Sequence, residues 1–200
     1  MSLSNLALDA PRSLKSDDII SGRKNLLSQP HMAALTTYVA NLRLLGLGRI
    51  PDFDPLDGGI NASILFLFEK PGPKALQFIS RNNNDPTAEN TFKFMNEAGI
   101  ERSLTATWNV IPGWNDTIDV ERDEIANGSN QLPELLGLFP HLKVIVAVGR
   151  RAEKALSKMN LSKVPIISST HPSNRNRNNP ATKDRWKAIP EQWAKSLEYL

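Results

Sequence analysis

Three polar side chains occur where an apolar stretch of this sequence ends and a proline-containing loop begins: Glu69, Asn109 and His171. A carboxylate such as Glu69 can orient or deprotonate a water molecule. The amide of Asn109 offers a donor and an acceptor side by side, which suits the edge of a planar ring. The imidazole of His171 can donate a hydrogen bond to charge that develops on a leaving group. Ordinary structural roles are the alternative: an ion pair or helix cap for Glu69, a turn contact for Asn109, and a structural or exposed side chain for His171.

The hydrophobic pattern predicts short buried strands that alternate with helices. Continuous apolar runs are typical of strands buried on both faces, and we expect strands over residues 63–68, 104–110, 143–148 and 164–169. Apolar spacing and capping residues predict helices over 32–47, from Asp85 to Gly99, over 131–139 and 150–159, and over 182–200 with an interruption at Pro190. Residues 1–29 form a polar lead-in, so the expected domain covers residues 30–200.

This alternation predicts an α/β fold, a parallel sheet with helices on both faces. Ligands of such sheets bind at the carboxyl ends of the strands. Three of the predicted strands end in polar, proline-containing loops, 69–72, 108–112 and 170–173. We therefore expect these loops to converge on one crevice.

Composition excludes several classes of protein. The longest apolar runs have five residues, whereas a membrane-spanning helix needs about 20, and the N-terminus lacks a signal-peptide pattern. The absence of cysteine excludes disulfides, thiolate metal sites and iron–sulfur clusters. With only three histidines, we expect an intracellular, cytoplasmic protein without metal or cofactor.

Positive charge is concentrated in the last third of the chain. Residues 143–187 contain eleven Lys and Arg but only two acids, which suggests a polyanionic partner; an ordinary solvated surface rich in lysine is the alternative. Directly after His171, residues 174–179 combine Asn with Arg175 and Arg177. Guanidinium groups suit phosphates, so we expect this stretch to contact a nucleic-acid backbone; a flexible surface loop is the alternative.

The order of these motifs resembles the uracil-DNA glycosylase superfamily. An apolar strand leads into Glu-x-Pro-Gly, a second strand ends in Thr-x-Asn-Val, then follow Val-x-x-Gly-x-x-Ala-x-x-Ala-Leu and a strand that leads into His-Pro-Ser. The resemblance covers residues 64–175 and is greatest to the branch with Glu-x-Pro-Gly and His-Pro-Ser motifs. It implies a three-layer α/β/α fold around a four-stranded parallel sheet. It also implies a monomeric DNA repair enzyme that flips uracil out of DNA and hydrolyses its N-glycosidic bond without metal or cofactor.

The resemblance assigns roles to residues by motif. Glu69 matches the first-motif glutamate, Asn109 the asparagine that binds the pyrimidine edge, and His171 the histidine that stabilises the departing base. The remaining matches are the base-pocket residues Lys70, Pro71 and Gly72, and the DNA-contacting residues Ser173, Asn174, Arg175 and Arg177.

Several positions depart from the superfamily pattern. Lys70 stands where several branches have the Asp or Asn that orients the attacking water, and Phe68 replaces a strand-end glycine. The cysteines of the iron–sulfur branch are missing. Phe78 and Phe53 are the candidates for the aromatic residue that stacks on the base.

These departures leave four hypotheses. The first is hydrolysis of the N-glycosidic bond of uracil or a related deaminated base in DNA. The second is a divergent member that binds nucleic acid or a nucleotide without base excision, as Lys70 would favour. In the third, the Lys70 amine attacks C1′ and gives lyase activity. The fourth is a phosphate-ester hydrolase, for which the sequence offers no cluster of metal ligands.

Overall fold

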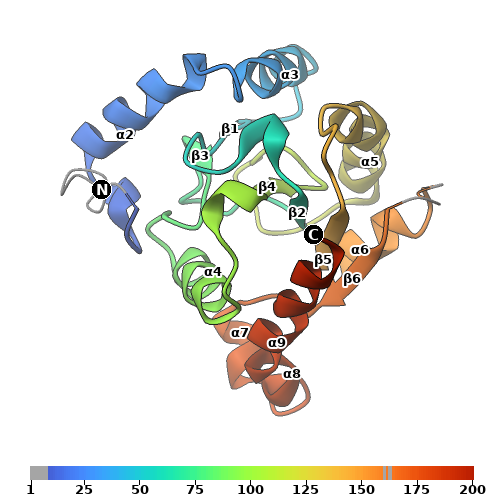
Figure 1. Cartoon of the computed structure of the whole chain (residues 1–200). Coiled ribbons are helices and arrows are strands. Elements are labelled where there is room, and N and C mark those ends of the chain that lie inside the picture. Colours follow the sequence, from blue (N-terminus) through green and yellow to red (C-terminus); the bar gives the residue numbers. More distant parts are fainter. Residues whose placement is uncertain (1–8, 160, 162–163) are drawn as a thin grey trace.

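A four-stranded parallel sheet forms the centre of the molecule (Figure 1). The computed structural model describes residues 9–159, 161 and 164–200. The strands are β2 (Ile64–Phe68), β4 (Thr105–Asn109), β5 (Val144–Val148) and β6 (Ile166–Ser169), in the spatial order β4-β2-β5-β6. The predicted α/β class and all four predicted strands are confirmed. A separate parallel pair joins β1 (Asp52–Phe53) to β3 (Phe78–Ile79).

Strand register places alternate residues of neighbouring strands on the same face of the sheet. Phe66 lies opposite Thr107, and Phe68 opposite Asn109. Because side chains alternate between faces along a strand, Thr107 and Asn109 share the face that carries Phe66 and Phe68. This face also supports the cavity described below.

Helices cover both faces of the sheet, as the α/β prediction requires. On the face of Phe66, residues of α4 (Pro86–Glu97) and α9 (Ile189–Ala194) complete one apolar cluster. On the other face, α3 (Ala33–Leu44), α5 (Arg122–Gly137) and α6 (Arg150–Leu156) contribute to a larger one. The remaining helices are α2 (Asp17–Lys24), α7 (Asn174–Asn178) and α8 (Lys183–Lys187), with 3₁₀ turns η1 (Ser13–Lys15), η2 (Asn25–Ser28), η3 (Gly59–Asn61), η4 (Arg102–Leu104) and η5 (Lys195–Tyr199).

Helix α5 is much longer than the segment 131–139 that its apolar residues predicted. A capping box between Glu121 and Glu124 starts the helix nine residues earlier, within a polar stretch. Gly128 then allows close packing, because a Cβ there would lie 2.0 Å from the carbonyl oxygen of Val110. Helix α5 is thus packed directly against the chain that leaves β4.

Two predicted segments near the C-terminus have a different local structure. The expected helix over 182–200 is divided into α8, α9 and η5. The stretch 174–179, expected as a flexible loop, contains the short helix α7, because the Ser173 side chain caps it by accepting a hydrogen bond from the backbone N–H of Asn176.

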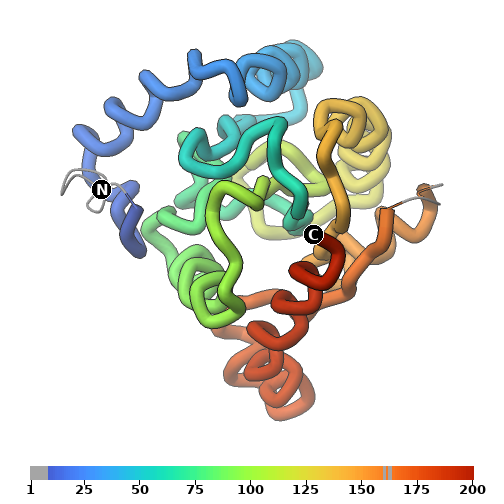
Figure 2. Tube along the Cα trace, in the orientation of Figure 1, coloured from blue at the N-terminus to red at the C-terminus, as the bar shows by residue number. Residues whose placement is uncertain are grey.

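The N-terminal segment is attached to the domain by a buried arginine. Figure 2 shows this segment running along the outside of the chain around residues 50–105. Arg23 of α2 is fully buried and donates to Asp54 at 2.8 Å and to Asn82 at 3.0 Å. The described part of the expected polar lead-in, residues 9–29, therefore packs against the domain; residues 1–8 lie outside the described residues. Within the described part of the chain, no helix has the length and apolar character needed to cross a bilayer.

Candidate base-binding cavity

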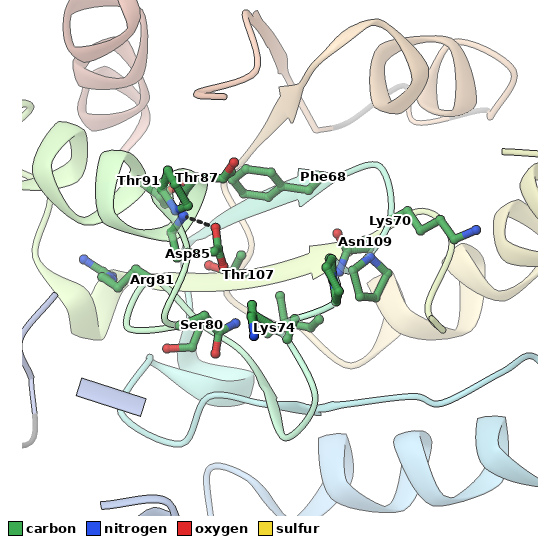
Figure 3. A pocket seen from close by; sticks show the side chains of 18 of the residues that line it. Phe68, Lys70, Lys74, Ser80, Arg81, Asp85, Thr87, Thr91, Thr107 and Asn109 are labelled. Carbon is green, nitrogen blue, oxygen red and sulfur yellow. Dashed lines mark hydrogen bonds between the residues drawn. The ribbon is translucent and has the colours of Figure 1, made fainter. Parts of the chain in front are cut away.

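A cavity of about 320 Å³ lies at the carboxyl ends of β2 and β4, on the face covered by α4 (Figure 3). Three segments enclose it: the ends of the strands, the loop that follows β2, and the first turns of α4. Its lining residues are Phe68, Lys70–Ala75, Ile79–Arg81, Asn83, Asp85–Ala88, Thr91, Thr107, Asn109 and His171. The loops after β2 and β6 and the end of β4 thus meet at one cavity.

Asn109 and Thr107 contribute the polar side chains of β4 to this cavity. Asn109 is the last residue of the strand and is buried. Among the described residues, no side chain or backbone group hydrogen-bonds to its amide, so both its donor and its acceptor are available to a ligand. Thr107 lies two residues back on the same face, and its hydroxyl oxygen is buried with no hydrogen-bond partner in the described structure.

His171 reaches the cavity from the loop after β6. Its ring packs edge-on against Phe68, with centroids 5.7 Å apart, and the loop is held by hydrogen bonds from Asn176 to the His171 carbonyl (2.9 Å) and from Asn90 to the Pro172 carbonyl (2.8 Å). Burial of the imidazole lowers the pKa of His171 from 6.5 to about 4. The ring is therefore neutral near pH 7 and can donate one hydrogen bond without carrying a charge.

Glu69 lies beside the cavity without lining it. Its carboxylate forms an ion pair with Arg151 in the first turn of α6, and both side chains are partly exposed. The sequence allowed an ion pair as the alternative role of Glu69, with the adjacent Lys70 as its partner. In the structure the partner is Arg151.

The Lys70 side chain extends away from the cavity, as Figure 3 shows. Its ammonium group is almost fully buried and donates to Asn115 Oδ1 (2.6 Å), the Asp119 carbonyl (2.9 Å) and Glu124 Oε1 (2.7 Å). Lys70 thereby attaches the loop after β2 to the start of α5. Pro71 and Gly72, which follow it, do line the cavity.

The first turns of α4 belong to the cavity, which the sequence pattern did not indicate. Asp85 is the N-cap that the sequence predicted and accepts a hydrogen bond from Ala88 N at 2.9 Å, but it also lines the cavity with Thr87 and Thr91. Burial raises the pKa of the Asp85 carboxyl above its ordinary value. The sequence explained Asp85 as a helix cap but did not indicate that it lines a cavity, because sequence spacing does not show which part of the fold the start of a helix faces.

The two aromatic residues proposed to stack on a base lie outside the cavity lining. Phe53 is buried and stacks on Trp108 at a centroid distance of 3.9 Å. Phe78 is fully buried. Among the described residues that line the cavity, Phe68 is the one with a Phe, Tyr or Trp side chain, and it stands where the superfamily pattern has a strand-end glycine.

The predicted DNA-contacting residues lie together on and beside α7. Ser173 caps the helix, and Asn174 accepts a hydrogen bond from Asn90 at 3.2 Å. Arg175 and Arg177 are exposed, and the Arg177 guanidinium lies 5.6 Å from the centre of the Trp186 ring. Since α7 starts three residues after His171, these arginines are close in sequence to a residue that lines the cavity.

A cluster of buried charges supports the cavity wall formed by Ser80 and Arg81. Asp54 contacts both Arg23 and Arg102, and Asp57 contacts Arg102 at 2.9 Å and Arg81 at 3.7 Å. Burial raises the pKa of Asp57 to about 6 despite these arginines. In the described residues, no three His, Asp or Glu side chains are grouped as metal ligands would be.

A match to a family profile identifies the family of this chain. Residues 55–195 match the profile of the Uracil DNA glycosylase superfamily, while a comparison with curated proteins returned no match. Solved structures with a similar fold include a point variant of mimivirus UNG in complex with UGI (16% identity, TM-score 0.42, 82% of this chain and 79% of that chain). Another is mimivirus uracil-DNA glycosylase (17% identity, TM-score 0.43, 78% of this chain and 73% of that chain). Since the profile match spans more than half of its length, the chain belongs to the uracil-DNA glycosylase superfamily.

Proposed function

We propose that this protein is a DNA glycosylase that hydrolyses the N-glycosidic bond of uracil, or of a related deaminated base, in DNA. The observation that carries the proposal is the cavity in which the unpaired amide of Asn109 and the neutral imidazole of His171 meet. Membership of the superfamily supports the reaction class. We further propose that the protein acts as a monomer in the cytoplasm without a cofactor.

The substrate base must leave the duplex to enter such a cavity, and glycosylases are among the enzymes that flip their target nucleotide. Asn109 would bind the edge of the flipped base. Uracil offers an acceptor where cytosine offers a donor, and a polar group left unpaired in a buried site costs about 1–3 kcal/mol. With its amide nitrogen turned towards that position, Asn109 would favour uracil over cytosine, while Phe68, Pro71 and Gly72 supply the apolar walls.

His171 would stabilise the departing base. As the glycosidic bond breaks, negative charge develops on the base and positive charge on the sugar. A neutral imidazole can donate a hydrogen bond to the base anion, and losing one such donor typically lowers the rate by about 100- to 1,000-fold. The Glu69 carboxylate, outside the lining residues, would favour the sugar cation from a greater distance. Ser173, Asn174, Arg175 and Arg177 would contact the DNA backbone beside the flipped nucleotide.

An oligonucleotide assay tests this proposal. A labelled duplex with one uracil is incubated with the protein and then treated with hot alkali, which cleaves at abasic sites. We expect cleavage by the wild type and a loss of about 100- to 1,000-fold in His171→Ala. His141→Ala, which removes an exposed histidine, is the matched control. Absence of cleavage with uracil, hypoxanthine and xanthine alike would reject the glycosylase function.

The second candidate is a protein that binds nucleic acid without excising a base. It is favoured by the positions of Glu69, which is paired with Arg151, and of the Lys70 ammonium, which is paired with Glu124. Neither group is in place to orient a water within the cavity. This candidate predicts tight binding of uracil-containing DNA with no abasic product.

A further inference from the structure

Hydrolysis requires a group in the cavity that can hold and deprotonate water, and neither the Glu69 carboxylate nor the Lys70 amine is placed to do so. Glu69 is bound to Arg151 outside the lining residues, and the Lys70 ammonium points away from the cavity. Among the described residues that line the cavity, Asp85 is the one carboxylate.

Asp85 is held in a fixed orientation by the start of α4. Its Oδ1 atom accepts a hydrogen bond from Ala88 N at 2.9 Å. A carboxylate can accept about four hydrogen bonds, so capacity remains for a ligand on the cavity side. Because burial raises the pKa of this carboxyl, Asp85 is also a stronger base than an exposed aspartate.

Thr107 provides an independent indication of a polar ligand in the same cavity. Thr107 is 5% exposed, and its hydroxyl oxygen has no partner among the described residues. Buried hydroxyl groups in folded proteins are almost always paired with protein or with ordered water. Rotation about the Cβ–Oγ bond reorients the hydroxyl hydrogen, so the Thr107 hydroxyl can hydrogen-bond to a water molecule in the cavity that Thr107 lines. Figure 3 shows Asp85 and Thr107 both beside the middle of β4.

We propose that Asp85 is the general base of the reaction and that Thr107 helps it to hold the attacking water. This inference rests on the proposed glycosylase function and names the group that activates its water. Asp85 would thus take the role for which the sequence offered Glu69, and which Asp or Asn fills at the Lys70 position in several branches.

The proposed step conserves atoms and charge. The water oxygen forms a bond to C1′ of the deoxyribose while the bond between C1′ and the base nitrogen breaks, and that electron pair leaves with the base. Asp85 accepts one proton from the water, and the anionic base is hydrogen-bonded by His171. Transfer of this proton to the released base, directly or through solvent, restores the Asp85 carboxylate.

Two near-isosteric variants test the proposal. Asp85→Asn removes the base, but Asn is as good an N-cap as Asp, so α4 should still form. Thr107→Val removes a hydroxyl that has no partner within the described structure while keeping the side-chain shape. Glu89→Gln is the matched control, because Glu89 lies in the same helix turn, outside the cavity lining, and pairs with Arg12. Single-turnover excision from uracil-containing duplex, DNA affinity by fluorescence anisotropy, and thermal stability are measured for each.

We expect Asp85→Asn to excise 100- to 10,000-fold more slowly, the usual contribution of a general base, with DNA affinity within about threefold of wild type. Thr107→Val should lose about tenfold in rate without losing stability, and Glu89→Gln should match the wild type. If Asp85→Asn fails to fold, Asp85→Ser, which also supplies a good N-cap, replaces it. Wild-type rates in the folded Asp85 variants would overturn this inference alone. A wild type that excises no base would overturn both it and the proposed function.

Discussion

The Glu69 carboxylate and the Arg151 guanidinium join the end of β2 to the first turn of α6. The pair lies at the rim of the cavity, with 30% of the Glu69 side chain and 49% of the Arg151 side chain exposed. Solvent screens such pairs, and their contribution to stability is typically below about 1 kcal/mol. The Glu69 carboxylate therefore lies outside the cavity lining and shares its charge with Arg151, instead of facing into the cavity.

We expect Glu69→Gln to reduce excision only about tenfold, because the carboxylate lies outside the cavity lining and shares its charge with Arg151. Urea unfolding should give a free energy within about 1 kcal/mol of wild type. Single-turnover kinetics measure the rate, and Arg151→Gln is the companion variant. A loss as large as that expected for Asp85→Asn would assign the catalytic carboxylate to Glu69 instead.

Lys70 should act as a structural contact and not as a nucleophile. A nucleophilic amine must be uncharged, whereas this ammonium donates to three oxygens, one of them the Glu124 carboxylate. Borohydride reduction on abasic DNA should therefore trap no covalent complex through Lys70. Lys70→Met should lower the free energy of unfolding by about 0.5–1.5 kcal/mol, because it removes hydrogen bonds to acceptors that solvent can still reach. A trapped complex that disappears in Lys70→Met would contradict this view.

The stability of the protein should depend on pH through His171. Its pKa is about 4 in the folded state, against an ordinary value of 6.5. Between these values the unfolded chain binds a proton that the folded protein does not, so stability falls as pH is lowered from 6.5 towards 4. In His171→Gln, the decrease in the free energy of unfolding between these pH values should be smaller than in the wild type by about 2–4 kcal/mol. Urea unfolding at pH 7, 5.5 and 4 measures it, with His141→Gln as the control; parallel curves for wild type and His171→Gln would contradict the prediction.

The buried pair of Arg23 and Asp54 should matter more for stability than any surface pair. Both side chains are fully buried, and removing one partner of such a pair typically costs about 3–5 kcal/mol. We expect a loss of this size for Arg23→Met. Arg12→Met, which breaks the partly exposed pair with Glu89, should cost less than about 1 kcal/mol. Equal losses in the two variants would show that Arg23 contributes only as an ordinary packed side chain.

Arg175 should contact a DNA phosphate. Each phosphate contact to duplex DNA contributes about 0.9 to the slope of log K against log salt concentration. Arg175→Gln should therefore lower the slope by about 1 and weaken binding to all sequences alike. The test is to measure DNA affinity by fluorescence anisotropy at salt concentrations between about 50 and 200 mM. An unchanged slope would remove Arg175 from the interface.

The sheet could be predicted from sequence because its two central strands, β2 and β5, are buried along their whole length. Ile64–Phe68 and Val144–Val148 have continuous apolar sequences that a half-exposed strand would not need. Helix α5 could be predicted only in its second half, because its first half is polar and depends on a capping box and on Gly128 against Val110. Local pattern thus identified elements with a strong apolar signal and missed those fixed by tertiary contacts.

The candidate site was predictable to the level of loops but not of side-chain direction. The rule for parallel sheets correctly brought Asn109 and His171 to one cavity. It could not indicate that Glu69 turns to Arg151 or that Lys70 turns to Glu124, since both partners are more than 50 residues away in sequence. The sequence identified Asp85 as a helix cap, but not as a residue that lines the cavity, because this depends on how α4 packs over β4.

Part of the buried charge cluster lies outside the region of similarity to the superfamily, residues 55–195. Two members of the buried charge cluster, Arg23 and Asp54, precede it. A chain trimmed to the matched region would enclose the guanidinium groups of Arg81 and Arg102 with Asp57 as their one remaining carboxylate in that cluster. Because unpaired charge is strongly unfavourable in a protein interior, the wall of the cavity depends on residues that a sequence comparison leaves out.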